Sequence, residues 1–355
     1  MEKQNRIWRG IGVMSGTSLD GLDLAYCIFY GDEKFELKHF KSIPYPEEIS
    51  LLLQSAYESS GEDLKNAETS YSDFVGDSIM QFMNHPDVDP EFIALHGHTI
   101  YHQPNRKMTF QLLNGHIVLE KTRMTTIYDF RSLDIALGGN GAPLVPIGDK
   151  YLFSEFDACL NIGGFANISA ELNGRYVAFD ICPANIVLNQ IASEKGMEYD
   201  KDGSLARQGK VSAILLDQLN SLEYYSKSYP KSLGREWLEE SFLKRMSSFN
   251  FEERIATATV HCAMQIARSI NSLKAKSVLC TGGGVLNTYL LESIQKETDA
   301  ELVIPEKNII EGKEALIFAF LGKRRLENQI NILASATGAS ANSSSGIVLY
   351  PYQIH

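Results

Sequence analysis

Cysteine is scarce in this sequence, and its placement argues against two kinds of covalent or metal-bound scaffold. The chain of 355 residues contains five cysteines, at Cys27, Cys159, Cys182, Cys262 and Cys280. Their number is odd, they are widely spaced and no two form a CxxC pair, so neither a disulfide framework nor a zinc site is indicated. We therefore expect reduced thiols, as in a cytoplasmic protein.

Positive charge and long apolar runs are also lacking. The formal net charge is -11, and binding to nucleic acid or to an anionic membrane surface needs a basic face, so we expect neither partner. No apolar run approaches the roughly 18 to 20 residues that span a bilayer, and the opening MEKQNRIWRG has no apolar core of a secretory signal. A small-molecule partner in the cytoplasm is favoured.

What the sequence does contain is an α/β pattern long enough for two domains. Its 44% hydrophobic and 22% charged residues are ordinary for a globular protein. Strand-like segments at 22–31 and 34–45 continue the opening strand as a meander, and helical patterns follow. The Gly- and Pro-rich segment 131–149 suits a crossing between domains. We expect an N-terminal lobe over 1–129, with the tail 345–355 as a candidate addition to it, and a C-terminal lobe over 130–344.

The second half repeats the plan of the first. DACLNIGGFANISAEL, residues 157–172, places two glycines between two strand-like runs, and RYVAFD supplies a third strand before a helix. The same order of strand, turn, strand and strand opens the chain, so two similar lobes on either side of a cleft are indicated. We assign the later strand and helix of ELVIP and KEALIFAFLGKRRL to the second lobe.

Three glycine-rich turns are candidates for binding phosphate. In the first, Ser15, Gly16, Thr17 and Ser18 can present backbone amides and hydroxyls to anionic oxygens. It is not a Walker A loop, because no GK[ST] follows and the next segment is a strand. A simple tight hairpin is the alternative. The turn at Gly163-Gly164 and the segment Gly282-Gly283-Gly284 favour a bound nucleotide, with its phosphates at the hairpins and its nucleoside near the triple glycine.

Seven ordered segments resemble a known family of bacterial kinases. They are GVMSGTSLDGLD, DFRSLDIALGGNGAPLVP, LNIGGFANIS, FDICPANIVLNQ, YDKDGSLARQGKV, PKSLGRE and CTGGGVLN. In this order they are similar to the anhydro-N-acetylmuramic acid kinase family, over nearly the whole chain. The resemblance implies the fold of the actin, sugar kinase and chaperone ATPase superfamily, with two ribonuclease-H-like α/β lobes and a central cleft.

The same resemblance implies an activity. The family uses ATP to open the 1,6-anhydro ring of anhydro-N-acetylmuramic acid and phosphorylates the freed 6-oxygen, giving N-acetylmuramic acid 6-phosphate in peptidoglycan recycling. Two departures affect sugar contacts. The family commonly reads D-T-G-P-G-N where this chain has Asp180-Ile181-Cys182-Pro183-Ala184-Asn185, and H-G-Q-T where this chain has His96-Gly97-His98-Thr99.

Asp180 is the candidate catalytic residue. It ends a strand-like run and precedes a helix that Asn185 is a candidate to cap, so its carboxylate should emerge at a strand end. Water that attacks the anomeric carbon must lose a proton, and a carboxylate can accept it. The alternative is a turn or helix-capping aspartate, which the residues alone favour equally. Cys182, with no His-Asp constellation nearby, is interpreted as packing.

The remaining site residues fall into two sets. The expected ATP-binding residues are Gly16, Thr17, Ser18, Leu19, Asp20, Gly21, Leu22, Asp23, Gly163, Gly164, Gly282, Gly283 and Gly284, and the expected substrate-binding residues are His98, Arg131, Asn185 and Glu314. ATP and Mg²⁺ are the expected cofactors, with Asp20 as the metal-side carboxylate.

Each of these assignments has an alternative. Asp20 and Asp23 are also ordinary hairpin-turn residues. Arg131 either meets the sugar's lactyl carboxylate or pairs with Asp129 or Asp134. Glu314 either approaches the cleft or is a favourable carboxylate in a helix's first turn. His98 and its neighbours favour polar substrate contact over zinc, with simple loop polarity equally open.

Three functions fit to different degrees. The first is the anhydro-N-acetylmuramic acid kinase, and the second is a kinase of another anhydrosugar such as levoglucosan. The third is an ATP-driven, chaperone-like or filament-forming binding protein, for which the sequence lacks a separate peptide-binding domain. A homodimer is left open.

Overall fold

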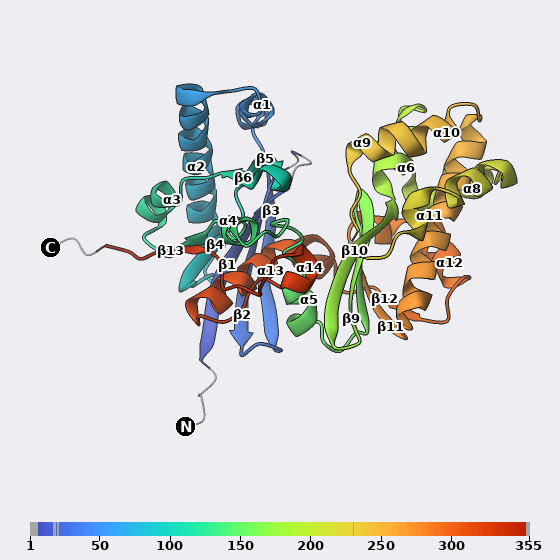
Figure 1. Ribbon diagram of the computed structural model, residues 1–355. Helices are drawn as coiled ribbons and strands as arrows, with labels where there is room; N and C mark the ends of the chain where they lie inside the picture. Colours follow the sequence, from blue (N-terminus) through green and yellow to red (C-terminus); the bar gives the residue numbers. More distant parts are fainter. Residues whose placement is uncertain (1–5, 17–18, 20, 230, 353–355) are drawn as a thin grey trace. The chain divides into compact units, whose positions relative to one another are not determined.

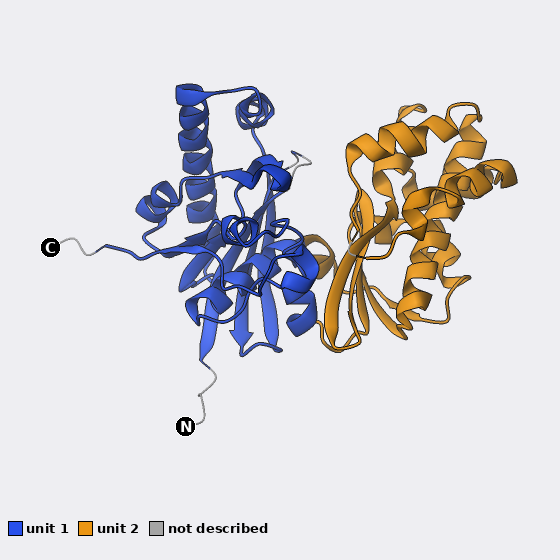
Figure 2. Ribbon diagram, in the orientation of Figure 1, with its two compact units in different colours: residues 1–152, 312–355 blue, residues 153–311 orange. Residues whose placement is uncertain are grey.

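The computed structural model describes residues 6–16, 19, 21–229 and 231–352. The chain folds into two compact units, unit 1 (residues 1–152 and 312–355) and unit 2 (residues 153–311), which Figure 2 shows in separate colours. Within the described part of the chain, no helix is both long and apolar enough to cross a membrane.

Unit 1 is built on a mixed six-stranded sheet in the order β13-β7-β4-β1-β2-β3 (Figure 1). β1 pairs antiparallel with β2 and parallel with β4, and β4 pairs parallel with β7. The elements of this unit are β1 (Ile7–Ser15), β2 (Gly21–Tyr30), β3 (Phe35–Pro44), α1 (Glu47–Ala56), α2 (Gly61–Met83), β4 (Phe92–Leu95), β5 (His98–Gln103), β6 (Met108–Leu112), α3 (Gly115–Thr122), β7 (Thr125–Tyr128), α4 (Ser132–Ala136), α5 (Pro146–Leu152), α13 (Lys307–Leu326, which begins in unit 2), α14 (Ala334–Thr337) and β13 (Ile347–Leu349).

Unit 2 has a mixed five-stranded sheet in the order β10-β9-β8-β11-β12. Its elements are β8 (Ala158–Ile162), β9 (Phe165–Leu172), β10 (Arg175–Pro183), α6 (Asn185–Ser193), α7 (Ser204–Gln208), α8 (Ala213–Asn220), α9 (Arg235–Trp237), the π-helix η4 (Leu238–Leu243), α10 (Lys244–Met246), α11 (Phe251–Leu273), β11 (Ser277–Thr281), the 3-10 helix η5 (Gly283–Leu286), α12 (Thr288–Gln295) and β12 (Glu301–Val303).

The two sheets share one strand topology. In unit 2, β8 pairs antiparallel with β9 and parallel with β11, and β9 pairs antiparallel with β10. This repeats the pairing of β1 with β2 and β4 in unit 1. A first strand therefore lies in the centre of each sheet, with an antiparallel meander on one side and parallel strands on the other. The internal repetition that the sequence predicts is confirmed.

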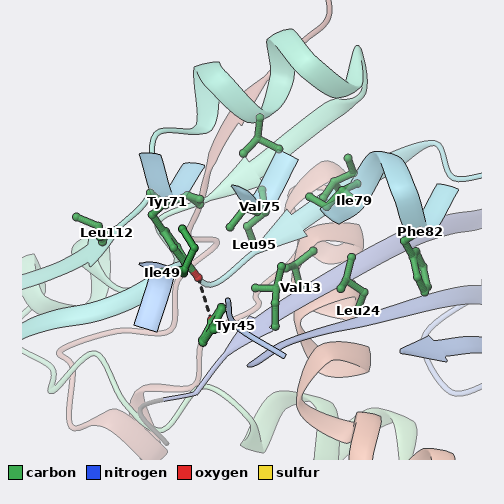
Figure 3. Close-up of a cluster of buried hydrophobic side chains, with 14 of the residues drawn as sticks. Val13, Leu24, Tyr45, Ile49, Tyr71, Val75, Ile79, Phe82, Leu95 and Leu112 are labelled. Atoms are coloured by element: carbon green, nitrogen blue, oxygen red, sulfur yellow. Dashed lines mark hydrogen bonds between the residues drawn. The ribbon is translucent and has the colours of Figure 1, made fainter. Parts of the chain in front are cut away.

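Alternating side chains of the unit 1 sheet build a core against α1 and α2. Tyr71 and Ile79 of α2 are fully buried against Val13, Leu24 and Leu95 of the sheet (Figure 3). This alternation follows from the two-residue period of a strand, which sends every second side chain to the same face.

The opposite face of the same sheet holds α13 at very short range. A Cβ on Gly12 of β1 would lie 1.7 Å from the carbonyl oxygen of Ala315, and one on Gly322 would lie 2.6 Å from the Cβ of Ala94. Only glycine permits this approach of helix backbone to strand.

The helix α13 differs from its expected place. The sequence pattern assigns its apolar segment 313–326 to the second lobe, whereas the packing of Ala315 on Gly12 places residues from 312 onward in unit 1. Asp129, the expected lobe boundary, likewise lies inside unit 1, which extends to Leu152. The Gly- and Pro-rich segment 131–149 belongs to unit 1 because Asp134 accepts a hydrogen bond from Thr337. The tail strand β13 pairs with β7 in the same unit.

We predict that Gly12→Ala destabilises the protein strongly. The added methyl group would overlap the backbone of α13, which cannot move without losing its contacts with the sheet, so we expect the free energy of unfolding to fall by about 3 kcal/mol. Urea unfolding measures this change. Gly234→Ala is the matched control, because a Cβ there meets nothing within 4 Å. Equal stability of the two variants would contradict the packing of α13 on Gly12.

Candidate functional site

Polar side chains of unit 1 collect where its parallel strands end. Ser15 is the last residue of β1, His96 follows β4, and Arg131 follows β7 by three residues. β1, β4 and β7 run parallel, so their carboxyl ends reach the same edge of the sheet. Residues far apart in sequence are therefore brought to one edge.

Ser15 is the centre of a buried hydrogen-bond network. Its hydroxyl lies 2.7 Å from the hydroxyl of Tyr45 and 2.8 Å from Nδ1 of His98, and Tyr45 lies 3.3 Å from the hydroxyl of Tyr71. His98 is 5% exposed, and burial lowers its pKa to about 4. The imidazole is therefore neutral near pH 7, and its described contact is with the base of the opening turn.

Arg131 binds a histidine and a backbone carbonyl. Its Nε and Nη2 lie 3.0 and 2.8 Å from Nε2 of His96, and its Nη1 donates to the carbonyl of Gly141 at 2.5 Å. Burial and the nearby guanidinium lower the pKa of His96 well below its usual value, so Nε2 can accept these hydrogen bonds. Burial lowers the pKa of Arg131 to about 10.

The alternative in which Arg131 forms an ion pair is not observed. Among the described residues, no carboxylate lies within 4.0 Å of its guanidinium nitrogens. Asp134 instead accepts hydrogen bonds from the amide of Gly141 and the hydroxyl of Thr337, both at 2.7 Å. The contact of Arg131 with a sugar carboxylate stays a prediction.

Glu314 lies within α13, in a cluster of charged groups. The helix begins at Lys307, two turns earlier, so the interpretation of Glu314 as a first-turn carboxylate is wrong. Desolvation by the surrounding protein, and after it the charge of the Asp23 carboxylate, raises the pKa of Glu314. Part of the residue is nevertheless exposed to solvent. Next to it, Lys313 and Asp149 form a buried ion pair at 2.7 Å.

The opening turn is described in part. Thr17, Ser18 and Asp20 lie outside the described residues. Leu19 has a φ of 60°, a left-handed conformation that is unusual for a leucine. Leu22 is 1% exposed and belongs to the core, and a Cβ on Gly21 would lie 2.5 Å from the carbonyl oxygen of Ile43.

The opening turn connects two antiparallel strands. β1 and β2 pair in register up to Ser15 and Leu22, so the turn is a hairpin and no helix follows it, as the sequence predicts. Gly16, which follows Ser15 directly, is half-buried. Asp23 is half-buried within β2, opposite Met14.

The glycines of the two candidate turns in unit 2 differ in how much space a side chain would have. A Cβ on Gly282, whose φ is +84°, would lie 2.6 Å from Oδ1 of Asn161, and one on Gly284 would lie 2.2 Å from Ile162. These two glycines are required by packing against β8. Gly163, Gly164 and Gly283 have no contact shorter than 3.3 Å at the same position, so their backbone is open to a ligand.

The Gly163-Gly164 turn is fixed to the start of α6. Its carbonyls accept hydrogen bonds from the amides of Ala184, Asn185 and Ile186 at 2.8 to 3.2 Å. The expectation that Asn185 caps α6 is wrong, because Ala184 occupies the N-cap position and no described side chain caps the helix. Nδ2 of Asn185 donates to the carbonyl of Ile162 at 3.3 Å and lies 3.8 Å from the Cβ position of Gly283.

One carboxylate oxygen of Asp180 is held by a hydrogen bond, and within the described residues the other is not. Its Oδ2 accepts a hydrogen bond from the amide of Leu233 at 2.8 Å, and its backbone binds Lys231 and Tyr224. No described group donates to Oδ1. Burial raises the pKa of Asp180 above its ordinary value.

Sequence reasoning did not assign the segment that holds Asp180. Residues 231–233, from the motif PKSLGRE, run along the outer edge of β10 and donate to Asp180 from Leu233. The sequence analysis also did not single out Asn161. A signal for it exists in the sequence: Asn161 and Asn167 are each three residues from Gly164, so they must lie opposite each other if the turn is a hairpin, as they do.

Cys182 is confirmed as a packing residue. It is fully buried in the core of unit 2, with its Sγ 3.6 Å from Sγ of Cys262 on α11. A β-bulge at Ile181 turns both Ile181 and Cys182 toward this core while Asp180 faces the other way. Within the described residues, no three His, Cys, Asp or Glu side chains gather into a metal site.

Two sheets of one topology, each with a turn after its first strand, define the class of protein. This is a duplicated α/β fold with one mixed sheet in each unit, as the resemblance to the kinase family implies. The model of the anhydro-N-acetylmuramic acid kinase family matches residues 8–351, so the chain belongs to that family.

Individual relatives agree with this assignment over nearly their whole length. The anhydro-N-acetylmuramic acid kinase of Vibrio cholerae serotype O1 is 32% identical, covering 96% of this chain and 98% of the relative. That of Caldanaerobacter subterraneus subsp. tengcongensis is 31% identical, covering 93% of each. Among solved structures, the activator of 2-hydroxyisocaproyl-CoA dehydratase from Clostridium difficile, with bound ADPNP, is similar over 90% of this chain and 97% of that one, at 12% identity and a TM-score of 0.44. That likeness is too distant to add to the argument.

We predict that His98 makes stability depend on pH. The folded protein binds fewer protons at His98 than the unfolded chain does between pH 6.5 and about 4, so stability falls as pH is lowered through this range. Between pH 7 and 5 the loss at this residue should be about 2 kcal/mol. His98→Gln, which can keep a hydrogen bond to Ser15, should lack this loss in urea unfolding at the two pH values. The exposed His116→Gln should behave like the wild type, and a wild-type pH dependence in His98→Gln would contradict the prediction.

Proposed function

We propose that this chain uses ATP to open the 1,6-anhydro ring of 1,6-anhydro-N-acetylmuramic acid and to phosphorylate its 6-oxygen. The products are N-acetylmuramic acid 6-phosphate and ADP. The membership of residues 8–351 in the anhydro-N-acetylmuramic acid kinase family supports this substrate. The observation that carries the chemistry is a carboxylate, Asp180, with one oxygen fixed and the other without a described donor.

Asp180 is suited to act as the general base. The amide of Leu233 fixes the orientation of the carboxylate through Oδ2 and leaves Oδ1 for the attacking water. Burial raises the pKa of Asp180, which makes its carboxylate a stronger base than an exposed aspartate. In the reaction, water attacks the anomeric carbon and gives a proton to Oδ1. The bond from that carbon to the 6-oxygen breaks, and the 6-oxygen takes the γ-phosphoryl group of ATP.

Both units contain candidates for binding the nucleotide. Gly16 begins the turn of unit 1, and the open backbones at Gly163, Gly164 and Gly283 in unit 2 fit close approach by phosphate or ribose. Mg²⁺ would arrive with the ATP phosphates and neutralise their charge, because magnesium usually keeps several waters and takes one or two protein carboxylates. Asp20 and Asp23 are our candidates for that role.

Four residues are our candidates for recognising the sugar. Arg131, His98 and Glu314 belong to unit 1, and Asn185 belongs to unit 2. The guanidinium of Arg131, held by neutral His96, supplies a fixed positive charge for an anionic sugar. We expect the protein to work in the cytoplasm, where ATP is available, and a homodimer stays a prediction.

A kinase of another anhydrosugar such as levoglucosan is the alternative, and it is considered because two positions of the chain depart from the family pattern. His98 occupies a position where the family commonly has glutamine, and Cys182 occupies a position where it commonly has glycine. ADP release should therefore be measured with anhydro-N-acetylmuramic acid, N-acetylmuramic acid, levoglucosan and glucose. We expect turnover with the first sugar, and turnover with levoglucosan alone would contradict the proposed substrate.

We predict that Asp180→Asn slows both bond changes together. The substitution keeps the shape and can keep the contact with Leu233 but removes the basic oxygen, so turnover should fall about a hundredfold to ten-thousandfold. Binding of ATP and of sugar, measured by calorimetry, should change far less. In the wild type, oxygen-18 from labelled water should appear at the anomeric carbon. Ring opening or ADP release at the normal rate in the variant would exclude Asp180 as the base.

We predict that Gly16→Val weakens nucleotide binding without unfolding unit 1. A branched side chain beside the opening turn would occupy the space that phosphate oxygens approach. Binding of ATP should weaken at least tenfold by calorimetry, while circular dichroism stays unchanged. Unaltered ATP affinity in the folded variant would contradict a phosphate-binding role for this turn.

A further inference from the structure

A row of polar residues, one on each of four neighbouring strands, runs across the sheet of unit 2 and begins at Asp180. Asp180 of β10 is directly opposite Asn167 of β9, Asn167 is opposite Asn161 of β8, and Asn161 is opposite Thr281 of β11. Residues in direct register across neighbouring strands send their side chains to the same face. We call Asp180, Asn167 and Asn161 the amide row.

The amide row lies on the face of the sheet away from the unit 2 core. The residues that alternate with it, such as Leu160, Ile168 and Phe179, are buried in the core formed with α11 and α12. The three members of the row are half-buried. Because the two carboxamides and the carboxylate do not pack in the apolar core, packing does not explain why these polar side chains lie side by side.

One end of the row reaches the glycine turns. Nδ2 of Asn161 lies 3.3 Å from the Cβ position of Gly163, and its Oδ1 lies 2.6 Å from that of Gly282. Asn161 therefore lies between the two glycine turns, and at Gly282 only glycine leaves room for its side chain. The row leads from these turns, across Asn167, to the open oxygen of Asp180.

Asn167 is the immediate neighbour of Asp180 within the row. Cβ atoms of directly opposed residues in an antiparallel pair are about 4.5–5.5 Å apart. A carboxamide at that distance can donate to a water molecule that also donates to Oδ1 of Asp180, and can accept from it. Asn161, two strands from Asp180, is roughly 10 Å away.

We propose that Asn167 is a positioning residue that holds the attacking water against Oδ1 of Asp180, while Asn161 orders the glycine turns. This inference rests on the proposed function, in which Asp180 takes the proton of that water. Asn167 itself neither gains nor loses a proton. The side-chain amide of Asn167 holds the water so that a lone pair of the water oxygen faces the anomeric carbon. A proton of the water then passes to Oδ1 of Asp180.

The first test needs no substrate. Asn167→Asp places a second carboxylate opposite Asp180, and Asn161→Asp places one twice as far away. Carbon-13 NMR titration of the Asp180 carboxyl should show its pKa raised by on the order of one unit in Asn167→Asp and far less in Asn161→Asp. The other titratable residues near Asp180 are Tyr224 and Lys231, which contact its backbone, and Cys182 on the opposite face of β10, and both variants keep them. Equal pKa values for Asp180 in the two variants would overturn the proposed juxtaposition.

The second test separates positioning from structure. Asn167→Ala should lower kcat about tenfold to a hundredfold, with KM for ATP changed less than threefold, whereas Asn161→Ala should mainly raise KM for ATP. In an Asp180→Asn background, Asn167→Ala should cause no further loss. Asn189→Ala, at an exposed position of α6, is the control and should match the wild type.

The outcomes distinguish this inference from the proposed function. Wild-type turnover with the anhydrosugar and an unchanged kcat in Asn167→Ala would overturn the role of Asn167 alone. Absence of wild-type turnover with every anhydrosugar would overturn the proposed function. If Asn167→Ala does not fold, as judged by circular dichroism, Asn167→Ser replaces it, and a wild-type kcat in that variant overturns the proposal in the same way.

Discussion

The parallel pairing of a first strand with a fourth is the constraint on which the candidate site depends. In unit 1 it joins β1 to β4, and in unit 2 it joins β8 to β11. Because parallel strands end at a common edge, Ser15 meets His98 in one unit and Asn161 meets Gly282 in the other. The antiparallel meander on the other side of each first strand supplies the turn, and in unit 2 it also places Asn167 and Asp180 beside Asn161.

The orientation of Asp180 depends on a segment outside the sheet. β10 is an edge strand, and residues 231–233 cover that edge by accepting from the amide of Asp180 and donating to its carboxylate. The bulge at Ile181 then lets the strand continue into the core while Asp180 faces the opposite side. Fixing one carboxylate oxygen with a backbone amide preserves the direction of the other, which is what a general base requires.

The two departures from the family pattern have local explanations. Cys182 adds a side chain where the family commonly has glycine, and the core of unit 2 accommodates its thiol beside Cys262. His98 replaces a common glutamine and keeps a polar contact, as a neutral imidazole, with Ser15 at the base of the opening turn. Both side chains are buried, so each change is compatible with the surrounding packing of its own unit.

The sequence by itself determined the local elements and the family. Period-two runs and glycine turns located the strands and the hairpins at Gly16 and Gly163, because those patterns depend on neighbouring residues only. The ordered motifs identified Asp180, but the expectation that it ends its strand is wrong, because β10 continues to Pro183. Tertiary structure alone decided the partners. α13 belongs to unit 1 through the contact of Ala315 with Gly12, Arg131 binds His96 in place of an aspartate, and Asn185 binds Ile162 without capping its helix. Each of these depends on side chains and backbone that meet only after the sheet has formed, and no local pattern in the chain encodes them.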